Sequence, residues 1–388
     1  MSQLRYWVWL ASVDGVRTIS LCRVLEHFGG AMEAYFAPEE RLSELEDLSP
    51  QERRALSDRS LERTEQILAL CQEKNIRILT LHDAAYPDRL RQIADPPLVL
   101  YVRGNLPFLD ELPTIAIVGT RKASAYGINV ATRLGQEITS YGGCVVTGMA
   151  LGVDGMAAAG SLDAQMPTAV VLGSGLDVVY PKMHTKLYKC ILRDGFAVSE
   201  YPPGAEPDAR NFPQRNRIIS GLARCVLVTE CPETSGALIT ANTALEQGRD
   251  VFAVPGPIDA PLSRGCNRLI ADGAAGLITD SWDVLREYEA IYPHKILGER
   301  VELPRTLGYQ AREELSRAKQ AAAEEILSLP TLNLKTNDAG LTDDQIAILR
   351  TLKDGALQVD DLIEKTQIPT RRVLSALTMM ELEGYVEQ

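Results

Sequence analysis

One pattern recurs between residues 113 and 256: a short apolar run ends in glycine or a polar residue, and a helical pattern follows. The apolar runs are 115–118, 144–146, 169–172, 226–228 and 251–254, with helical patterns between them, for example at 126–141 and 236–247. Continuous apolar strands that alternate with helices are typical of a parallel sheet with both faces covered. The pattern therefore predicts an α/β fold with an extended Rossmann-like parallel sheet over 113–290.

Glycines mark the ends of these runs. Gly119 and Gly173 each follow a run directly, and Gly148 follows one after a threonine. Ligands of parallel sheets bind at the carboxyl ends of the strands. Glycine lets the backbone approach a ligand closely, and the amides of the next helix turn can point at an anion. These loops therefore predict a phosphate-binding site.

The overall charge restricts how such a protein can hold a nucleic acid. The chain has a net charge of −12, which argues against nucleic-acid binding over its whole surface. DNA would need a local basic patch, and residues 210–217 supply three arginines, an aromatic residue and two asparagines within eight residues. An arginine can hold a phosphate, and Phe212 can stack on a base.

The candidate DNA-binding residues lie in the strand-end loops, the basic segment and a later helix start. They are Gly119, Thr120, Arg121, Ser124, Ser174, Arg210, Phe212, Arg215, Asn216, Arg217, Ser235 and Gly236. Each segment also has a purely structural interpretation. The Gly119–Arg121 loop can be a simple turn with a surface arginine, and Arg215 and Arg217 can pair with internal carboxylates such as Glu200 or Glu230.

Helical and connecting segments flank the predicted core. Residues 1–75 predict a helical domain in which Gly29-Gly30 ends one helix. Its helix–glycine turn–helix pattern resembles a helix-hairpin-helix or SAM-like unit, which can offer turn amides to a DNA phosphate. No Lys/Arg cluster flanks the turn, which favours a packing or interaction module. Residues 76–112 predict extension strands that join the core.

Two further segments follow the core. Residues 291–338 predict a linker with a lone helix over 311–327. Residues 339–388 predict three short helices and a terminal strand, which resemble a winged helix. Arg371 and Arg372 would begin its recognition helix, but acidic residues surround them, so partner binding or dimerisation is as consistent as DNA reading.

No pattern in the sequence indicates catalysis, a metal or a cofactor. The four histidines are scattered, no GxxxxGK[ST] motif occurs, and the seven cysteines include no CxxC pair. We interpret the cysteines as small buried hydrophobic residues. Asp154 and Glu230 lie near strand ends, where each can be a helix cap or an ion-pair partner. The N-terminus does not resemble a signal peptide and no membrane-spanning run occurs, so we expect a soluble cytoplasmic protein without membrane insertion.

Several motifs together resemble the bacterial DNA-processing protein A family (DprA, also called Smf). The matching runs are YPDRLRQIADPPLVLYVRGN, VGTRKASAYG, TGMALGVDGMA, VLGSGLDVVYP, SEYPPG, FPQRNRIISGLA, SGALITA and PGPIDAPLSRGCNRLI. The resemblance implies a homodimer that binds and protects incoming single-stranded DNA and loads the RecA recombinase during natural transformation in competent cells. It also implies that the protein is not an enzyme.

The resemblance also implies roles for individual residues. Arg121 corresponds to a DNA-phosphate ligand, and the segment from Phe212 to Arg217 lines the family's DNA groove. Ser235 and Gly236 match the family's SG helix start. This chain has Leu151 and Ala158 where family members usually carry Arg and His, so roles that depend on those two side chains do not carry over.

Two other functions remain open from the sequence. One is a nucleotide-hydrolysing enzyme of the lysine-decarboxylase-like (phosphoribohydrolase) type, which shares the glycine layout, although residues 230–236 lack the double glycine of its PGGxGTxxE signature. The other is a protein-binding adaptor, which the acidic end domains favour.

Overall fold

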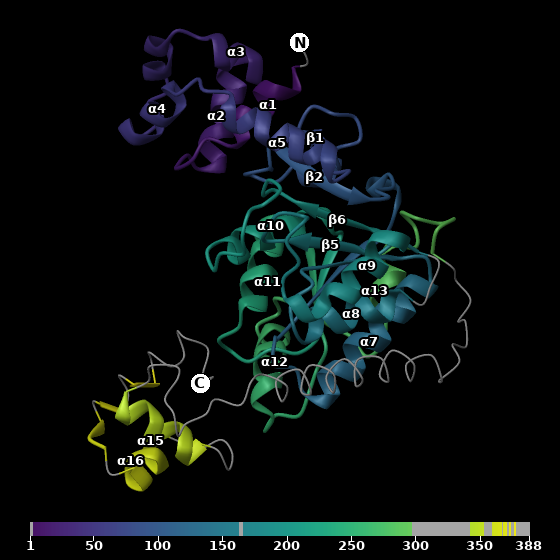
Figure 1. The fold of residues 1–388 in the computed structure, drawn as a ribbon. Helices are drawn as coiled ribbons and strands as arrows, with labels where there is room; N and C mark the ends of the chain where they lie inside the picture. Colours follow the sequence, from purple (N-terminus) through teal and green to yellow (C-terminus); the bar gives the residue numbers. More distant parts are fainter. Residues whose placement is uncertain are drawn as a thin grey trace. The chain divides into compact units, whose positions relative to one another are not determined.

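The computed structural model describes residues 3–162, 166–296, 342–352, 359–366 and 368–370, together with Arg372, Val373, Ala376 and Leu377. The chain divides into two compact units, Met1–Ser316 and Arg317–Gln388. The first unit contains the sheet and its helices, and the second contains the C-terminal helices (Figure 1).

The described part of the first unit is built on one nine-stranded sheet, in the order β1-β2-β6-β5-β4-β3-β7-β8-β9. The strands are β1 (Arg77–Thr80), β2 (Val99–Gly104), β3 (Thr114–Val118), β4 (Cys144–Thr147), β5 (Ala169–Leu172), β6 (Phe196–Ser199), β7 (Cys225–Val228), β8 (Asp250–Ala253) and β9 (Gly276–Leu277). All neighbouring pairs from β6 to β9 in this order are parallel. The extension strands β1 and β2 add to β6 at the edge in antiparallel orientation.

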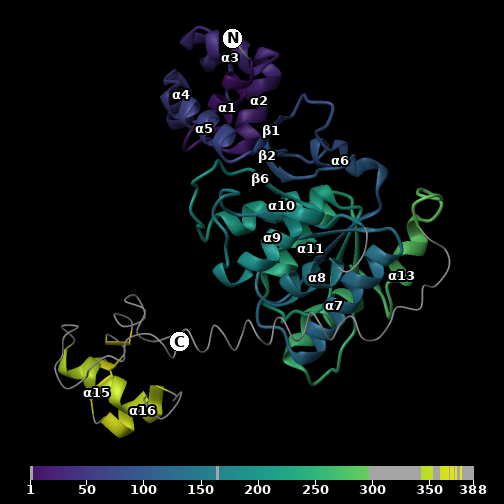
Figure 2. The same ribbon diagram turned by 45° about the vertical axis from the view of Figure 1, so that its right-hand side comes forward.

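Helices cover both faces of the sheet (Figure 1, Figure 2). One face packs against α6 (Asp88–Arg91), α10 (Asn211–Leu222), α11 (Gly236–Glu246) and α12 (Arg264–Ala271). The other packs against α7 (Ala125–Ser140), α8 (Val153–Ser161), α9 (Thr185–Asp194) and α13 (Trp282–Leu285). Short 3-10 helices are η1 (Glu39–Glu44), η2 (Leu109–Glu111), η3 (Lys182–His184), η4 (Pro261–Ser263) and η5 (Arg286–Tyr288).

Burial on both faces explains the continuous apolar runs of the sequence. In β5, Ala169 and Val171 belong to one hydrophobic cluster, and Val170 and Leu172 belong to the cluster on the opposite face. Successive side chains of a strand point to opposite faces, so a strand covered on both sides needs apolar residues at every position. The predicted Rossmann-like fold class is confirmed.

The N-terminal helices pack onto the same body. They are α1 (Leu4–Ala11), α2 (Thr18–Phe28), α3 (Ala31–Phe36), α4 (Pro50–Ser57) and α5 (Glu62–Glu73). Gly29, with φ of +80°, ends α2 as predicted. Buried residues of these helices share one hydrophobic cluster with β2 and β5, so the helical segment and the sheet form a single compact unit.

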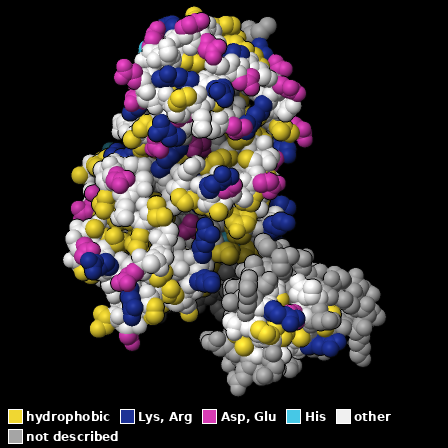
Figure 3. Space-filling view, turned by 90° about the vertical axis from the view of Figure 1, so that its left-hand side faces the viewer, with side chains coloured by type: hydrophobic (Ala, Val, Ile, Leu, Met, Phe, Trp, Pro, Cys, Tyr) yellow, Lys and Arg dark blue, Asp and Glu magenta, His cyan; other side chains and the backbone are white. Residues whose placement is uncertain are grey.

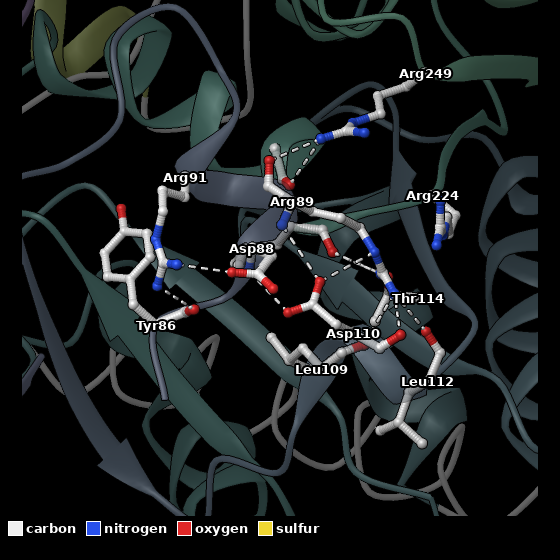
Figure 4. Close-up of polar contacts among 12 residues, drawn as sticks. Tyr86, Asp88, Arg89, Arg91, Leu109, Asp110, Leu112, Thr114, Arg224 and Arg249 are labelled. Atoms are coloured by element: carbon white, nitrogen blue, oxygen red, sulfur yellow. Dashed lines mark hydrogen bonds and ion pairs between the residues drawn. The ribbon is translucent and has the colours of Figure 1, made fainter. Parts of the chain in front are cut away.

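A buried arginine fastens the extension to the core (Figure 4). Arg89 of α6 is 4% exposed and donates hydrogen bonds to the carbonyl oxygens of Leu109, Asp110 and Leu112. It also donates to the hydroxyl of Tyr292 at 2.7 Å. Burial lowers the pKa of its guanidinium. Because these acceptors come from separate segments, the contacts tie η2 and the start of β3 to α6.

The described part of the second unit contains α15 (Asp343–Leu352) and α16 (Val359–Thr366). Ile348, Leu362, Val373, Ala376 and Leu377 form its small core. Arg372 pairs with Asp344 at 2.7 Å. Arg371, the predicted helix over 311–327, the terminal strand and most of the predicted linker lie outside the described residues.

The cysteines behave as the sequence predicts. All seven are free, and six are buried while Cys190 is half-buried. Among the described residues, no helix is both long and apolar enough to cross a membrane, and no group of histidine, cysteine or acidic residues has the arrangement of a metal site.

Candidate nucleic-acid interface

A pocket of about 550 Å³ lies at the carboxyl ends of β3, β4 and β7, and we call it the strand-end pocket. Its walls are the loops after these strands and the first turns of α10 and α11. A smaller pocket of about 40 Å³ adjoins it and shares Arg121, Ala150, Tyr180, Phe212 and Arg215. Figure 3 turns the α10–α11 side of Figure 1 towards the viewer and shows basic and hydrophobic side chains interspersed on this side.

The structure brings most of the candidate residues together. Those that line the strand-end pocket are Gly119, Thr120, Arg121, Phe212, Arg215, Asn216, Ser235 and Gly236. Ser174 lines the smaller pocket, where it is buried and donates a hydrogen bond to the carbonyl oxygen of Val178. Ser124, Arg210 and Arg217 line neither pocket.

The loop after β3 is packed too tightly for any residue but glycine at its start. A Cβ on Gly119 would lie 2.5 Å from Val153 and 2.8 Å from the carbonyl oxygen of Glu230. Ser124 then caps α7 by accepting a hydrogen bond from the Gly127 amide. Ser124 also donates to the buried Glu230 carboxylate, from its amide at 2.8 Å and from its hydroxyl at 2.5 Å. Ser124 and Glu230 therefore both help to hold the start of α7 in place.

Arg121 is the exposed cation of the strand-end pocket. Its guanidinium carbon lies 5.0 Å from the centroid of the Phe212 ring, a distance at which a cation is attracted to an aromatic face. Within the described part of the chain, no carboxylate pairs with it. A guanidinium presents a planar fork of donors that matches a phosphate, and here that fork is available to a ligand.

Arg215 lies beneath the pocket rather than in its mouth. It is 3% exposed and donates hydrogen bonds to the carbonyl oxygens of Gly148, at 2.8 Å, and Val171. Burial lowers the pKa of Arg215 to about 10, against the attraction of Asp154. Burial likewise raises the pKa of the Asp154 carboxyl, although Arg215 opposes this. The two buried groups attract each other electrostatically beneath the pocket.

The other two arginines of the basic segment have internal partners. Arg217 is 8% exposed and pairs with Glu200 at 2.6 Å and with Asp95 at 3.1 Å. Arg210 is exposed and pairs with Asp208 at 2.7 Å. The structural interpretation of Arg217 as a partner of Glu200 is thus confirmed. Residues two apart on a helix point about 200° away from each other, so Arg215 and Arg217 of α10 face different surroundings.

The start of α11 forms another wall of the pocket. The Ser235 hydroxyl accepts a hydrogen bond from the Ala237 amide and so caps the helix. A Cβ on Gly236 would meet no atom within 4 Å, which leaves open space beside this helix start. Asn216, partly exposed on α10, lines the same pocket and offers both donors and an acceptor.

The candidate set lacks one aromatic residue that the structure places in both pockets. Tyr180 follows the loop after β5 and is 43% exposed. The signal in the sequence was an aromatic residue downstream of a strand-end glycine loop.

The two residues that depart from the family pattern lie in different surroundings. Leu151 lines the smaller pocket, and Ala158 is fully buried in α8.

Comparison with known proteins gives the family. Residues 77–289 match the family model described as DNA recombination-mediator protein A, and residues 334–388 match the DprA winged helix domain. The chain is also 33% identical to Protein Smf of Synechocystis sp. over 400 aligned residues, which cover 100% of this chain and 97% of that protein. This chain belongs to the DNA recombination-mediator protein A (DprA) family. The C-terminal winged-helix prediction is thereby confirmed.

Other DprA proteins match parts of the chain. DNA processing protein DprA of Streptococcus pneumoniae is 44% identical over 207 residues, 53% of this chain and 72% of that protein. Its X-ray structure superposes with a TM-score of 0.63 at 35% identity, over 73% of this chain and 97% of that one. A Helicobacter pylori DprA structure, reported for its single-stranded DNA binding mode, gives a TM-score of 0.51 at 28% identity, over 56% and 97% of the two chains.

Proposed function

We propose that this protein binds single-stranded DNA in the strand-end pocket, protects incoming strands and loads RecA on them during natural transformation and recombination. Membership of the DprA family and the described single-stranded DNA binding of the Helicobacter pylori relative support the proposal. In this role the protein acts as a homodimer and catalyses no reaction.

The observation that carries the proposal is that Arg121 is exposed and has no carboxylate partner among the described residues. In a chain of net charge −12, this exposed arginine stands beside a pocket of about 550 Å³ without a carboxylate partner among the described residues. A cation that is buried and paired with an internal carboxylate has few donors left for a ligand, as is the case for Arg217. Arg121 instead keeps its donors for an external anion, and the DNA backbone supplies one phosphate per nucleotide.

The pocket also suits an unpaired strand. Single-stranded nucleic acid is commonly held by a basic groove for the backbone and aromatic side chains for the bases. Within one pocket, Arg121 provides the basic group and Tyr180, which contacts Phe212, provides an exposed aromatic ring. Asn216 and the capped start of α11 add polar groups that can hydrogen-bond to a base or a phosphate.

A binding titration tests the proposal. Fluorescence anisotropy of a labelled thymidine oligonucleotide, at several stated salt concentrations, compares the wild type with Arg121→Ala. We expect weaker binding, and a slope of log K against log salt that is shallower by about 0.7, the change for one lost contact to a single-stranded phosphate. The control is Arg193→Ala, because Arg193 is 74% exposed at the far end of α9. Equal affinity and slope for all three proteins would overturn the proposal.

RecA loading and dimerisation need separate tests. RecA filament formation on oligonucleotides coated with single-stranded DNA binding protein should speed up when this protein is added. Light scattering at micromolar concentration should give twice the monomer mass.

The geometry does not favour the hydrolase alternative. That alternative gave Glu230 a chemical role, but both of its carboxylate oxygens accept hydrogen bonds from Ser124.

A further inference from the structure

The ring of Phe212 is already surrounded by protein. Arg121 lies over it at 5.0 Å and the guanidinium carbon of Arg215 is 5.8 Å from its centroid. A Cβ on Gly173 would lie 3.1 Å from its Cδ1 atom, so the backbone of the loop after β5 packs against the ring. Phe212 is only half-exposed as a result. A base that stacked on it would have to displace one of these groups.

Tyr180 has the opposite surroundings. It is 43% exposed and lines both pockets. Its ring contacts Phe212, with centroids 5.5 Å apart and planes tilted by 36°. Its hydroxyl has no hydrogen-bond partner within the described residues. The side chain is therefore supported on one side by Phe212 and leaves aromatic surface for a ligand.

We propose that Tyr180 is the residue on which a DNA base stacks, and that Phe212 is a positioning residue that holds Tyr180 and Arg121 in place. This inference rests on the proposed binding of single-stranded DNA. A nucleotide bound in this way places its base against Tyr180 and a phosphate at Arg121, because both side chains contact the same Phe212 ring.

The division of roles separates base binding from phosphate binding, so the two can be measured independently. Stacking needs a base, whereas the attraction of Arg121 for phosphate does not. Loss of a stacking side chain weakens binding of single strands by about 5- to 150-fold. The salt dependence reports only the phosphate contacts, so it distinguishes the two residues.

The experiment compares ordinary and abasic oligonucleotides of equal length in the anisotropy titration. Tyr180→Ala should weaken binding of the ordinary strand by about 5- to 150-fold, without change in the salt slope or in binding of the abasic strand. Tyr180→Phe should bind as the wild type does, because the hydroxyl is not needed. Phe212→Ala should weaken both strands and reduce the salt slope, as Arg121→Ala does. Phe108→Ala is the matched aromatic control. Phe108 is 69% exposed and precedes η2, which leads into the amino end of β3, whereas the strand-end pocket lies at the carboxyl end of that strand.

Each outcome decides between the two proposals. If the wild type fails to bind, or if Arg121→Ala binds equally well, the proposed function itself fails. If Arg121→Ala weakens binding but Tyr180→Ala does not, only the stacking inference is overturned. An equal loss for ordinary and abasic strands with Tyr180→Ala also overturns it, since that result means a general disturbance of the pocket. Thermal unfolding of each variant checks that the fold is intact.

Discussion

Arg217 is held where two acidic residues from different segments meet. Its side chain is 10% exposed and is paired with Glu200, which follows β6, and with Asp95 of the extension. Removing Arg217 would leave the carboxylate of Glu200, which is 19% exposed, without its nearest counter-charge, whereas Asp95 is 38% exposed and stays in contact with solvent. The guanidinium thus joins the extension to the core, and its place on α10 is structural.

We predict that Arg217→Ala lowers the free energy of unfolding by about 1–3 kcal/mol, because both partners keep some contact with solvent. Urea unfolding followed by circular dichroism measures this. Arg210→Ala is the matched control, because its pair with Asp208 is exposed, and its midpoint should stay at the wild-type value. At temperatures where Arg217→Ala is folded, its affinity for single-stranded DNA should equal that of the wild type. A DNA-binding defect in the folded variant would contradict the structural role.

Arg215 and Asp154 give a prediction that depends on pH. Burial raises the pKa of Asp154 above its ordinary value, and Arg215 opposes this. In Arg215→Met the carboxylate loses its counter-charge, so its pKa in the folded state should rise further. A raised folded-state pKa stabilises the protein at low pH, and this contribution is lost as pH rises through that pKa. Arg215→Met should therefore be less destabilised at about pH 5 than at about pH 8. Adding Asp154→Asn should remove the difference, and an unchanged pH dependence would contradict the attraction between the two groups.

At the scale of elements, the strand-end loops use glycine for two different reasons. At Gly119 a Cβ would overlap Val153 and the Glu230 carbonyl, whereas at Gly236 it would meet open space. We predict that Gly119→Ala is destabilising, by about 1–3 kcal/mol for such overpacking. Gly236→Ala should leave stability equal or slightly higher, because alanine favours helix formation. Thermal unfolding of both variants measures the contrast, and equal effects would show that the loop after β3 has room.

The sequence was most informative where an element is buried on both faces. The runs that became β3, β4, β5, β7 and β8 were predicted, as were α7 and α11. We did not assign β6 or β9. β6 is as short and as buried as β4, β5 and β7, but no helix follows it directly, because residues 200–210 come before α10. Both residues of β9 are exposed. The pairing of β2 with β6 depends on segments that are far apart in the sequence, so local pattern cannot give its direction.

The candidate site was predicted in outline but not in detail. Motifs predicted that Arg121, Asn216 and the start of α11 lie close together, and the structure places them around one pocket. They could not show which arginines of residues 210–217 face outwards, because that depends on where α10 begins and on carboxylates from other segments. Tyr180 was missed for a related reason, since its exposure beside Phe212 is a property of the folded loops.

At the scale of the whole molecule, the net charge of −12 argues against DNA binding over the whole surface, and the proposed site is confined to the first unit. All residues of the strand-end pocket belong to Met1–Ser316. We predict that a chain ending at Ser316 binds single-stranded DNA within a few-fold of the full-length protein. The anisotropy titration measures this, with circular dichroism as the control for folding. A loss comparable to that of Arg121→Ala would show that the winged-helix unit takes part in holding the strand.

Hydrogen exchange with and without a thymidine oligonucleotide tests the central claim most directly, because it reports where on the chain the DNA binds. The account predicts slower exchange in peptides that cover 119–124, 173–182, 210–219 and 234–240, which surround the strand-end pocket. Peptides over 109–114 and 222–225 lead into the amino ends of β3 and β7, away from the pocket, and should exchange as in the free protein. Protection found only in those two peptides or in residues 342–377, with none at the strand-end pocket, would contradict the account.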